Sequence, residues 1–371
     1  MKKSTIFFIA AFFLTAFVNA QETPEKFYAG TFTSEGAEGI YRCSFNPSSG
    51  EIAIEQVFKG IDNPNFLRIT ADRKYLYAVS RAPKAVDPDG GAVMAYAISA
   101  DGSLVFLNKQ SSHGEDPCYV DVSSDGKFVA VANYGGGSVA LYPVRADGSL
   151  EPASSVILHE GSGPNKARQT RAYAHSIRFS DRNDQVIAAD LGTDKLFLYN
   201  LDRKEQKLVP SSQAKVSLPP GSGPRHFEIT ADHSFCYVVN ELLSTVTVFR
   251  MDGEKFTEIQ NISALPPGFT GTSYCADVHL SPDGKFLYVS NRGHQSLAVF
   301  QRGNDGLLAA VQYVPVEGNW PRNFAIDPSG KFMLVANQRS HNITVFRLEN
   351  GIPVFTGKEL KIPAPVCISF Y

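Results

Sequence analysis

The sequence has little that would direct the protein to nucleic acid, a lipid surface or a metal. Its 35 Lys and Arg residues nearly balance 37 Asp and Glu residues, for a formal net charge of −2. This balance provides no basic surface for nucleic acid or anionic membranes. The five cysteines form no CxxC pair and no other metal-ligand spacing, so we expect small buried side chains and no structural metal or cofactor.

The chain also lacks a long hydrophobic run. The apolar stretch from Ile6 to Val18 follows two lysines and is too short to span a bilayer with ease. Small residues at its end are typical of a signal-peptidase site before Gln21, and no Cys follows that would carry a lipid anchor. We predict a signal peptide over residues 1–20 and a single domain over 21–371. The mature protein is then a periplasmic or secreted monomer without a membrane anchor; an uncleaved anchor is the alternative.

One short pattern occurs six times. Each copy is a β-rich run, a polar turn that is most often Asp-Gly-Lys, a second β-rich run and a small polar residue. The turn provides the positive φ values that tight hairpins need, and two further short strands follow each copy. The copies lie about 46 to 57 residues apart, a period typical of propeller blades. The second runs end on Ser80, Asn133, Asp190, Asn240, Asn291 and Asn337.

The two ends of the chain complete this pattern. Residues 26–32 are similar to the second strand of a copy, and residues 365–371 are similar to the first. Paired, they would form a seventh blade and remove an open sheet edge. The sequence therefore predicts an all-β, seven-bladed β-propeller of four-stranded antiparallel blades, closed by its N- and C-terminal strands. A six-bladed ring with a separate N-terminal hairpin is the alternative.

Chemically active side chains recur at equivalent positions of the copies. Within a hairpin the first strand begins where the second ends, so residues at both places should meet on one face of the disc. The candidates for catalysis are His175, Arg225, Glu241 and Arg292. The candidates for substrate binding are Asn133, Asp190, His226, Asn291, Arg322, Asn337 and Arg168.

Arginines grouped around a glutamate and a histidine suit an anionic ligand and the activation of a water. A carboxylate between arginines, as expected for Glu241, is a candidate for a perturbed pKa. Structural explanations remain open beside these. Asn and Asp at strand ends commonly bond turn backbone, a single Arg usually forms a rim salt bridge, and His175 could be a hydrogen-bonded structural residue.

The loop over residues 161–176 interrupts the repeat just before His175. It is rich in glycine, but it has no GK[ST] and no helix follows it, which excludes a nucleotide P-loop. Lys166, Arg168 and Arg171 could cover the face of the disc as a cationic lid, or form an exposed basic loop. No GxSxG elbow is present either, which disfavours an acyl-enzyme.

The motifs GSGPNKARQ, AHS, ADLGTDKLFLYNLD, GPRHF, VVNE, SPDGKFLYVSNRG and NWPRNF together resemble the propeller-type lactonases, a family that includes a bacterial 6-phosphogluconolactonase. The resemblance extends from about Lys26 to the C-terminus. Fungal carboxy-muconate lactonizing enzyme is a more distant member of the superfamily. The resemblance implies hydrolysis of a sugar-acid lactone, with AHS, GPRHF, VNE and SNRG assigning catalytic roles to His175, Arg225, Glu241 and Arg292.

Opening a lactone requires a water nucleophile, stabilisation of an oxyanion and protonation of the leaving alkoxide. His175 or Glu241 could accept the proton of the water, and Arg225 and Arg292 could stabilise the oxyanion without a metal. The substrate would be a phosphorylated lactone or, given export, an unphosphorylated aldonolactone.

A non-enzymatic class of protein remains as the alternative: an exported propeller that binds a glycan, a small acid or a protein partner. A quinone-dependent dehydrogenase is disfavoured, because Trp320 is the only Trp in the chain.

Overall fold

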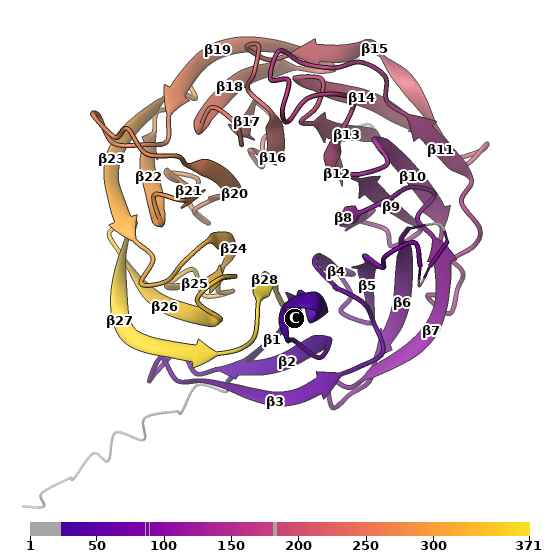
Figure 1. Cartoon of the computed structure of the whole chain (residues 1–371), viewed down its shortest axis with the longest axis horizontal. Helices are drawn as coiled ribbons and strands as arrows, with labels where there is room; N and C mark the ends of the chain where they lie inside the picture. Colours follow the sequence, from indigo (N-terminus) through magenta and orange to yellow (C-terminus); the bar gives the residue numbers. More distant parts are fainter. Residues whose placement is uncertain (1–23, 86, 89, 181–183) are drawn as a thin grey trace, which may run out of the picture.

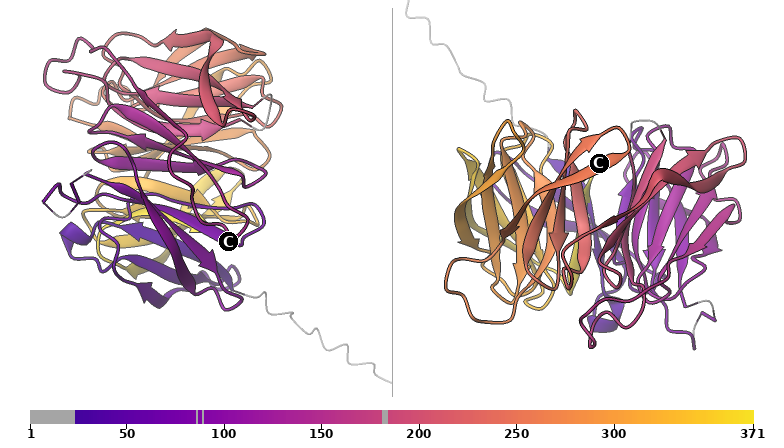
Figure 2. Two further views of the ribbon diagram at one scale, coloured as in Figure 1. Left: turned by 90° about the vertical axis from the view of Figure 1, so that its right-hand side faces the viewer. Right: turned by 90° about the horizontal axis from the view of Figure 1, so that it is seen from above.

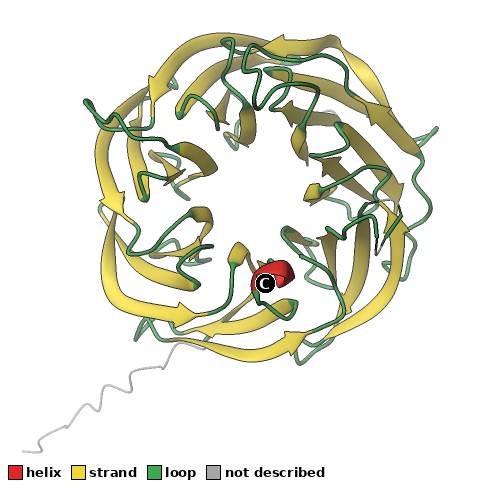
Figure 3. Ribbon diagram, in the orientation of Figure 1, coloured by secondary structure: helices red, strands yellow, loops and turns green. Residues whose placement is uncertain are grey.

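Seven four-stranded antiparallel sheets form a closed ring in the computed structural model (Figure 1). The structure describes residues 24–85, 87–88, 90–180 and 184–371, so the predicted signal peptide lies outside the described residues. Side views show a disc whose strands run between two loop-bearing faces (Figure 2). A single short 3₁₀-helix, η1 (Thr33–Glu35), accompanies the strands within the described ranges (Figure 3). The prediction of seven blades is confirmed, and the six-bladed alternative is wrong.

Each blade orders its four strands from the axis outward. The innermost strands are β28 (Pro365–Phe370), β4 (Leu67–Ile69), β8 (Pro117–Val122), β12 (Ala174–Phe179), β16 (Pro224–Ile229), β20 (Tyr274–Leu280) and β24 (Pro321–Ile326). The second strands are β1 (Glu25–Thr31), β5 (Tyr75–Ser80), β9 (Phe128–Asn133), β13 (Gln185–Asp190), β17 (Phe235–Asn240), β21 (Phe286–Arg292) and β25 (Phe332–Asn337).

The outer half of each blade is a second hairpin. The third strands are β2 (Ile40–Phe45), β6 (Ala92–Ile98), β10 (Ser138–Pro143), β14 (Lys195–Asp202), β18 (Thr245–Asp252), β22 (Ser296–Arg302) and β26 (Asn342–Glu349). The outermost are β3 (Ile52–Phe58), β7 (Leu104–Ser111), β11 (Ser155–Leu158), β15 (Lys207–Ser217), β19 (Lys255–Ser263), β23 (Leu308–Pro315) and β27 (Ile352–Lys361).

The chain ends close the ring as predicted. The C-terminal strand β28 pairs antiparallel with β1, with Phe27 opposite Phe370 and Ala29 opposite Ile368. The sheet then continues through β2 to β3. One blade is therefore built from both ends of the chain, so the fold is complete only when the last strand is in place.

The hydrophobic core lies between neighbouring blades. Second strands such as β9 are buried along their whole length, because the two neighbouring blades cover both faces of each blade. The residues there form a continuous apolar run rather than an alternating one. Phe45 of the closing blade packs edge-on against Phe332 of the preceding blade, with ring centroids 5.1 Å apart.

The turns of the inner hairpins explain the repeated Asp-Gly-Lys. Asp125 accepts hydrogen bonds from the Ser123 hydroxyl and the Lys127 amide, and Gly126 has a φ of 71°. In two other copies Arg73 and His233 occupy this left-handed position, with φ values of 59° and 56°. The side-chain cap on the turn is therefore shared, while glycine is favoured but replaceable.

All five cysteines are buried and unpaired, and each lies in a strand, as their isolated spacing predicts. Among the described residues, no helix is long and apolar enough to cross a membrane.

Candidate active site

Five innermost strands have an irregularity at or near their first residues. Pairing with the second strand skips Cys118 in β8, His175 in β12, Arg225 with His226 in β16, Ala276 with Asp277 in β20, and Arg322 in β24. Three of these strands begin with a proline, which has no N–H for the ladder. Because a bulge releases residues from pairing, it re-aims their side chains. The skipped residues all lie on the face where inner strands begin, which we call the entry face.

Glu241 is the centre of the charged groups on the entry face. It follows β17, its amide donates to the Gly223 carbonyl at 2.8 Å, and only 4% of the residue is exposed. Its Oε1 lies 2.6 Å from Nη2 of Arg168, and its Oε2 lies 2.7 Å from Nη2 of Arg292 and 3.2 Å from Nε of Arg225. Three guanidinium groups from separate parts of the chain thus converge on one carboxylate.

The electrostatics of Glu241 follow from this contact set. Burial by itself would raise the pKa of the Glu241 carboxyl, but the arginines, led by Arg292, hold the pKa well below its usual range. Burial and the charge of Arg292 lower the pKa of Arg225 to about 10. The carboxylate therefore stays ionised and holds together cations that would otherwise repel each other.

The loop before β12 delivers Arg168. Gln169 is fully buried and donates to the Leu191 carbonyl at 2.8 Å and to Asp194 at 2.6 Å. Asp194 in turn accepts the amide of Gly223, close to Glu241. Of the three basic residues predicted to form a lid, only Arg168 is shown reaching the cluster; Lys166 and Arg171 are exposed.

Arg322 is the fourth arginine of the entry face. Its guanidinium lies 5.2 Å from the ring centre of Phe32, in a cavity of about 520 Å³ that Arg81 and Gln338 also line. Within the described part of the chain, no carboxylate is in hydrogen-bonding contact with it. Burial, then Arg225 and Arg292, lower the pKa of Arg322 to about 9. Glu35 and Asp116 also line the cavity, but Glu35 accepts from Gln338 and Asp116 pairs with Arg81.

His175 is held among aromatic rings beside the arginines. The residue is 5% exposed, and its ring lies 5.3 Å from the ring of Tyr134 and 5.5 Å from that of His226, edge-on to both. Its Nδ1 is 3.8 Å from Sγ of Cys118. Burial, and secondly the charge of Arg225, lower the pKa of His175 well below its usual value. The imidazole is therefore neutral and keeps a lone pair on one ring nitrogen.

The predicted Asn and Asp positions behave differently. Their side chains are fully buried and bond to groups near strand ends and turns: Asn133 to the Ser112 carbonyl, and Asp190 to the amides of Tyr173 and Thr193. Asn291 and Asn337 are equally buried and donate through their side-chain amides, while Oδ1 of Asn133 and of Asn337 has no hydrogen-bond partner among the described residues. These contacts match the structural explanation, so we leave the four residues out of the proposed site.

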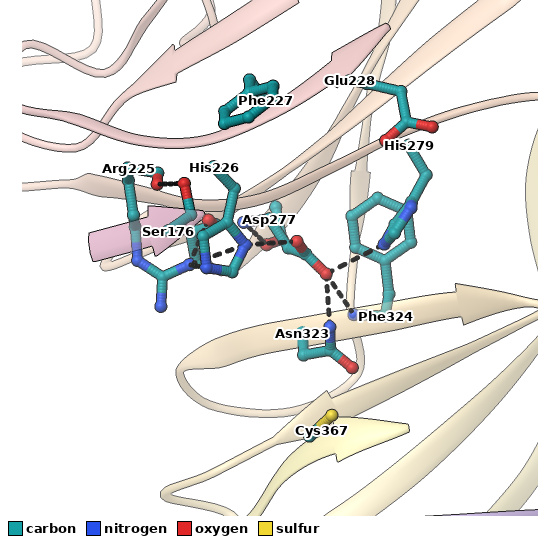
Figure 4. Close-up of polar contacts among 12 residues, drawn as sticks. Ser176, Arg225, His226, Phe227, Glu228, Asp277, His279, Asn323, Phe324 and Cys367 are labelled. Carbon is teal, nitrogen blue, oxygen red and sulfur yellow. Dashed lines mark hydrogen bonds and ion pairs between the residues drawn. The ribbon is translucent and has the colours of Figure 1, made fainter. Parts of the chain in front are cut away.

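Sequence reasoning missed two participants in this arrangement. The hydroxyl of Tyr134 lies 3.5 Å from Nη2 of Arg168, and its ring stacks on that of Tyr173 with ring centroids 4.9 Å apart. Asp277 accepts a hydrogen bond from His226 (Figure 4). The repeat itself could have indicated Asp277, because CADV and PRHF place Asp277 and His226 at the same position of their copies.

Comparisons with known proteins identify the family of the chain. The family model described as "Lactonase, 7-bladed beta-propeller" matches residues 26–370. The chain belongs to this family of seven-bladed propeller lactonases, and it is a lactonase.

Individual relatives cover nearly the whole chain. A 6-phosphogluconolactonase of Bacillus subtilis is 37% identical, covering 92% of this chain and 97% of its own. A 6-phosphogluconolactonase of Formosa agariphila is 35% identical over 81% of this chain and 86% of its own. The structure of the periplasmic gluconolactonase of Pseudomonas aeruginosa superposes with a TM-score of 0.89 at 34% identity, covering 94% of this chain and 99% of that one.

Proposed function

We propose that the protein hydrolyses the lactone ring of a sugar acid at the cluster around Glu241. The observation that carries the proposal is the convergence of Arg168, Arg225 and Arg292 on one buried carboxylate beside a neutral histidine. Such a site attracts an anionic substrate and has cations in place before charge develops on it. Membership in an enzyme family favours this interpretation over a non-enzymatic binding propeller.

In the proposed reaction a water attacks the lactone carbonyl. Arg225 and Arg292 stabilise the negative oxygen of the tetrahedral intermediate, since both retain N–H groups not used by Glu241. Among the described residues, Nε of Arg292 is buried without a hydrogen-bond partner. Collapse of the intermediate breaks the ring C–O bond and gives the open hydroxy acid, which releases one proton at neutral pH.

His175 is the proton acceptor that the contacts favour over Glu241. Both oxygens of Glu241 are occupied by guanidinium groups, so neither can take a proton without displacing an arginine. His175 is neutral, can take the proton of the water and can then deliver it to the leaving alkoxide. Glu241 instead keeps the arginines in place.

Arg322 is the proposed contact for an acidic or phosphorylated part of the substrate. Its cavity opens on the entry face, and the cation lacks a carboxylate partner among the described residues. A phosphorylated lactone of the kind named for the Bacillus subtilis relative would place its phosphate there. If residues 1–20 direct export, an unphosphorylated aldonolactone is the corresponding substrate, as the name of the periplasmic Pseudomonas aeruginosa neighbour suggests.

A panel of phosphorylated and plain aldonolactones tests the proposal. Proton release is followed in weak buffer and corrected for spontaneous hydrolysis, for the wild type and for His175→Asn. We expect turnover of at least one lactone, and a loss of about 10²-fold or more in the variant, the usual scale for a missing acid or base. No turnover above the spontaneous rate would overturn the function, while full activity of His175→Asn would overturn only the role of His175.

A further inference from the structure

Asp277 is a buried carboxylate bonded on both oxygens. Its Oδ1 lies 2.7 Å from Nδ1 of His226. Its Oδ2 accepts from Nε2 of His279 at 3.1 Å, from the Asn323 side chain at 2.5 Å and from the Phe324 amide at 3.3 Å. Figure 4 shows these donors arranged around the one carboxylate, from three neighbouring blades. Asp277 is 3% exposed and lies within β20, so this carboxylate neither caps a turn nor contributes to the surface.

The contact with Asp277 determines which nitrogen of His226 carries the proton. An ionised carboxylate only accepts, so Nδ1 of His226 must be the donor. In a neutral imidazole Nε2 then has a lone pair and no proton. Burial, and next the charge of Arg225, lower the pKa of His226 to about 3, so the ring is neutral at ordinary pH.

Arg225 lies against this ring. Its Nη1 is 3.1 Å from Nε2 and 3.3 Å from Nδ1 of His226, and it also donates to the carbonyl of Ala276. Nη1 is closer to Nε2, the nitrogen that keeps its lone pair in this tautomer, than to Nδ1. A neutral ring with the proton on Nδ1 can accept this N–H at Nε2, whereas an imidazolium has no free lone pair and would repel the cation.

These contacts hold two nitrogens of the guanidinium. Nε faces Glu241, and Nη1 faces His226 and the backbone next to Asp277. Among the described residues, Nε makes no hydrogen bond although it lies 3.2 Å from Oε2 of Glu241, and Nη2 makes neither a hydrogen bond nor an ion pair. Nε and Nη2 are therefore the N–H groups that could meet a substrate oxygen.

We propose that Asp277 is a positioning residue of the lactonase reaction: it fixes the tautomer of His226, which supports the Arg225 guanidinium in the orientation that meets the oxyanion. The inference rests on the proposed role of Arg225. Among the described residues, His279 also bonds Asp277 but makes no direct contact with Arg225.

The test begins with Asp277→Asn and His226→Asn. In the first variant the amide N–H₂ faces donors only, so His226 must change tautomer or lose its bond. In the second variant, the Asn side-chain amide can still donate to Asp277, but the imidazole ring that contacts Arg225 is absent. We expect kcat to fall by about 10²-fold in both, as for a misplacement of about 1 Å, with KM changed much less because the lost contact acts in the transition state.

His279→Gln is the matched control, since its amide still donates to Asp277 at the other side. It should retain kcat within about twofold, and thermal melting should show that all variants fold. If Asp277→Asn fails to fold, His226→Asn decides the question. Unchanged kcat in His226→Asn would overturn the proposal.

A double-mutant cycle separates this inference from the proposed function. If Asp277 acts through Arg225, then Asp277→Asn should cost less than about threefold in an Arg225→Ala background, because interacting sites are not additive. Independent, multiplicative losses would contradict the inference. Wild-type activity of Arg225→Ala alone would instead contradict the role of Arg225 itself.

Discussion

Arg168 and Glu241 are 73 positions apart in the chain, yet Nη2 of Arg168 lies 2.6 Å from Oε1 of Glu241. Arg168 comes from a loop before β12, and Glu241 follows β17 in the next blade. The contact joins two blades across the entry face and makes the loop part of the site.

Replacing Arg168 by Ala should reduce kcat/KM by about 10- to 100-fold, because a hydrogen bond between charged groups contributes about 1.5 to 3 kcal/mol. Lys166→Ala is the matched control, being a cation of the same loop that is exposed and has no such contact. Steady-state assays on a responsive lactone measure both. Equal effects of the two variants would show that only the general charge of the loop matters.

Glu241→Gln should fold and lose about 10²-fold or more in turnover, the scale for catalytic groups misplaced by about 1 Å, because a neutral amide cannot hold three guanidinium groups together. Arg225→Ala and Arg292→Ala should each cost roughly 3 to 4 kcal/mol of transition-state stabilisation. Melting curves and kcat are measured on the same preparations. Wild-type rates in Glu241→Gln would remove the main support for the proposed site.

Acid should destabilise the protein partly through His226. The pKa of His226 is about 3 in the folded protein and about 6.5 in the unfolded chain, so between these values the unfolded chain binds more protons. This contribution to stability is complete above about pH 6.5 and decreases as the pH falls toward 3. The melting temperature of the wild type should therefore drop more steeply from pH 6.5 to about pH 4 than that of His226→Asn. Parallel profiles would contradict the assignment.

Deleting residues 365–371 should lower the melting temperature markedly or prevent folding. The deletion removes β28, in which Val366, Cys367 and Ile368 are buried, and each fully buried apolar side chain contributes about 1.5 to 3 kcal/mol. Removing Tyr371 alone, which lies beyond β28, should cost much less. A melting curve unchanged by the longer deletion would rule out closure through this strand.

The mature chain should begin at Gln21, because residues 2–20 have the pattern of a signal peptide. Intact-mass measurement on protein from its native host decides this. Retention of Met1 on a cytoplasmic species would exclude export and favour the phosphorylated lactone as substrate.

The sequence alone determined the seven blades and their closure. Hairpin runs, capped turns and the complementary terminal strands are local patterns, and each repeats often enough to establish the register. That register also placed His175, Arg225, Glu241 and Arg292 on one face, since in an antiparallel hairpin the start of one strand and the end of the next coincide.

Tertiary structure decided which of these side chains meet. Asn133 and Asp190 both close second strands on this face, but their side chains bond nearby backbone, Asn133 the Ser112 carbonyl and Asp190 the Thr193 amide, and not the charged cluster. The contacts of Arg168 with Glu241 and of His226 with Asp277 join neighbouring blades. They depend on bulges and on the spacing of packed sheets, and no local pattern along the chain encodes those distances.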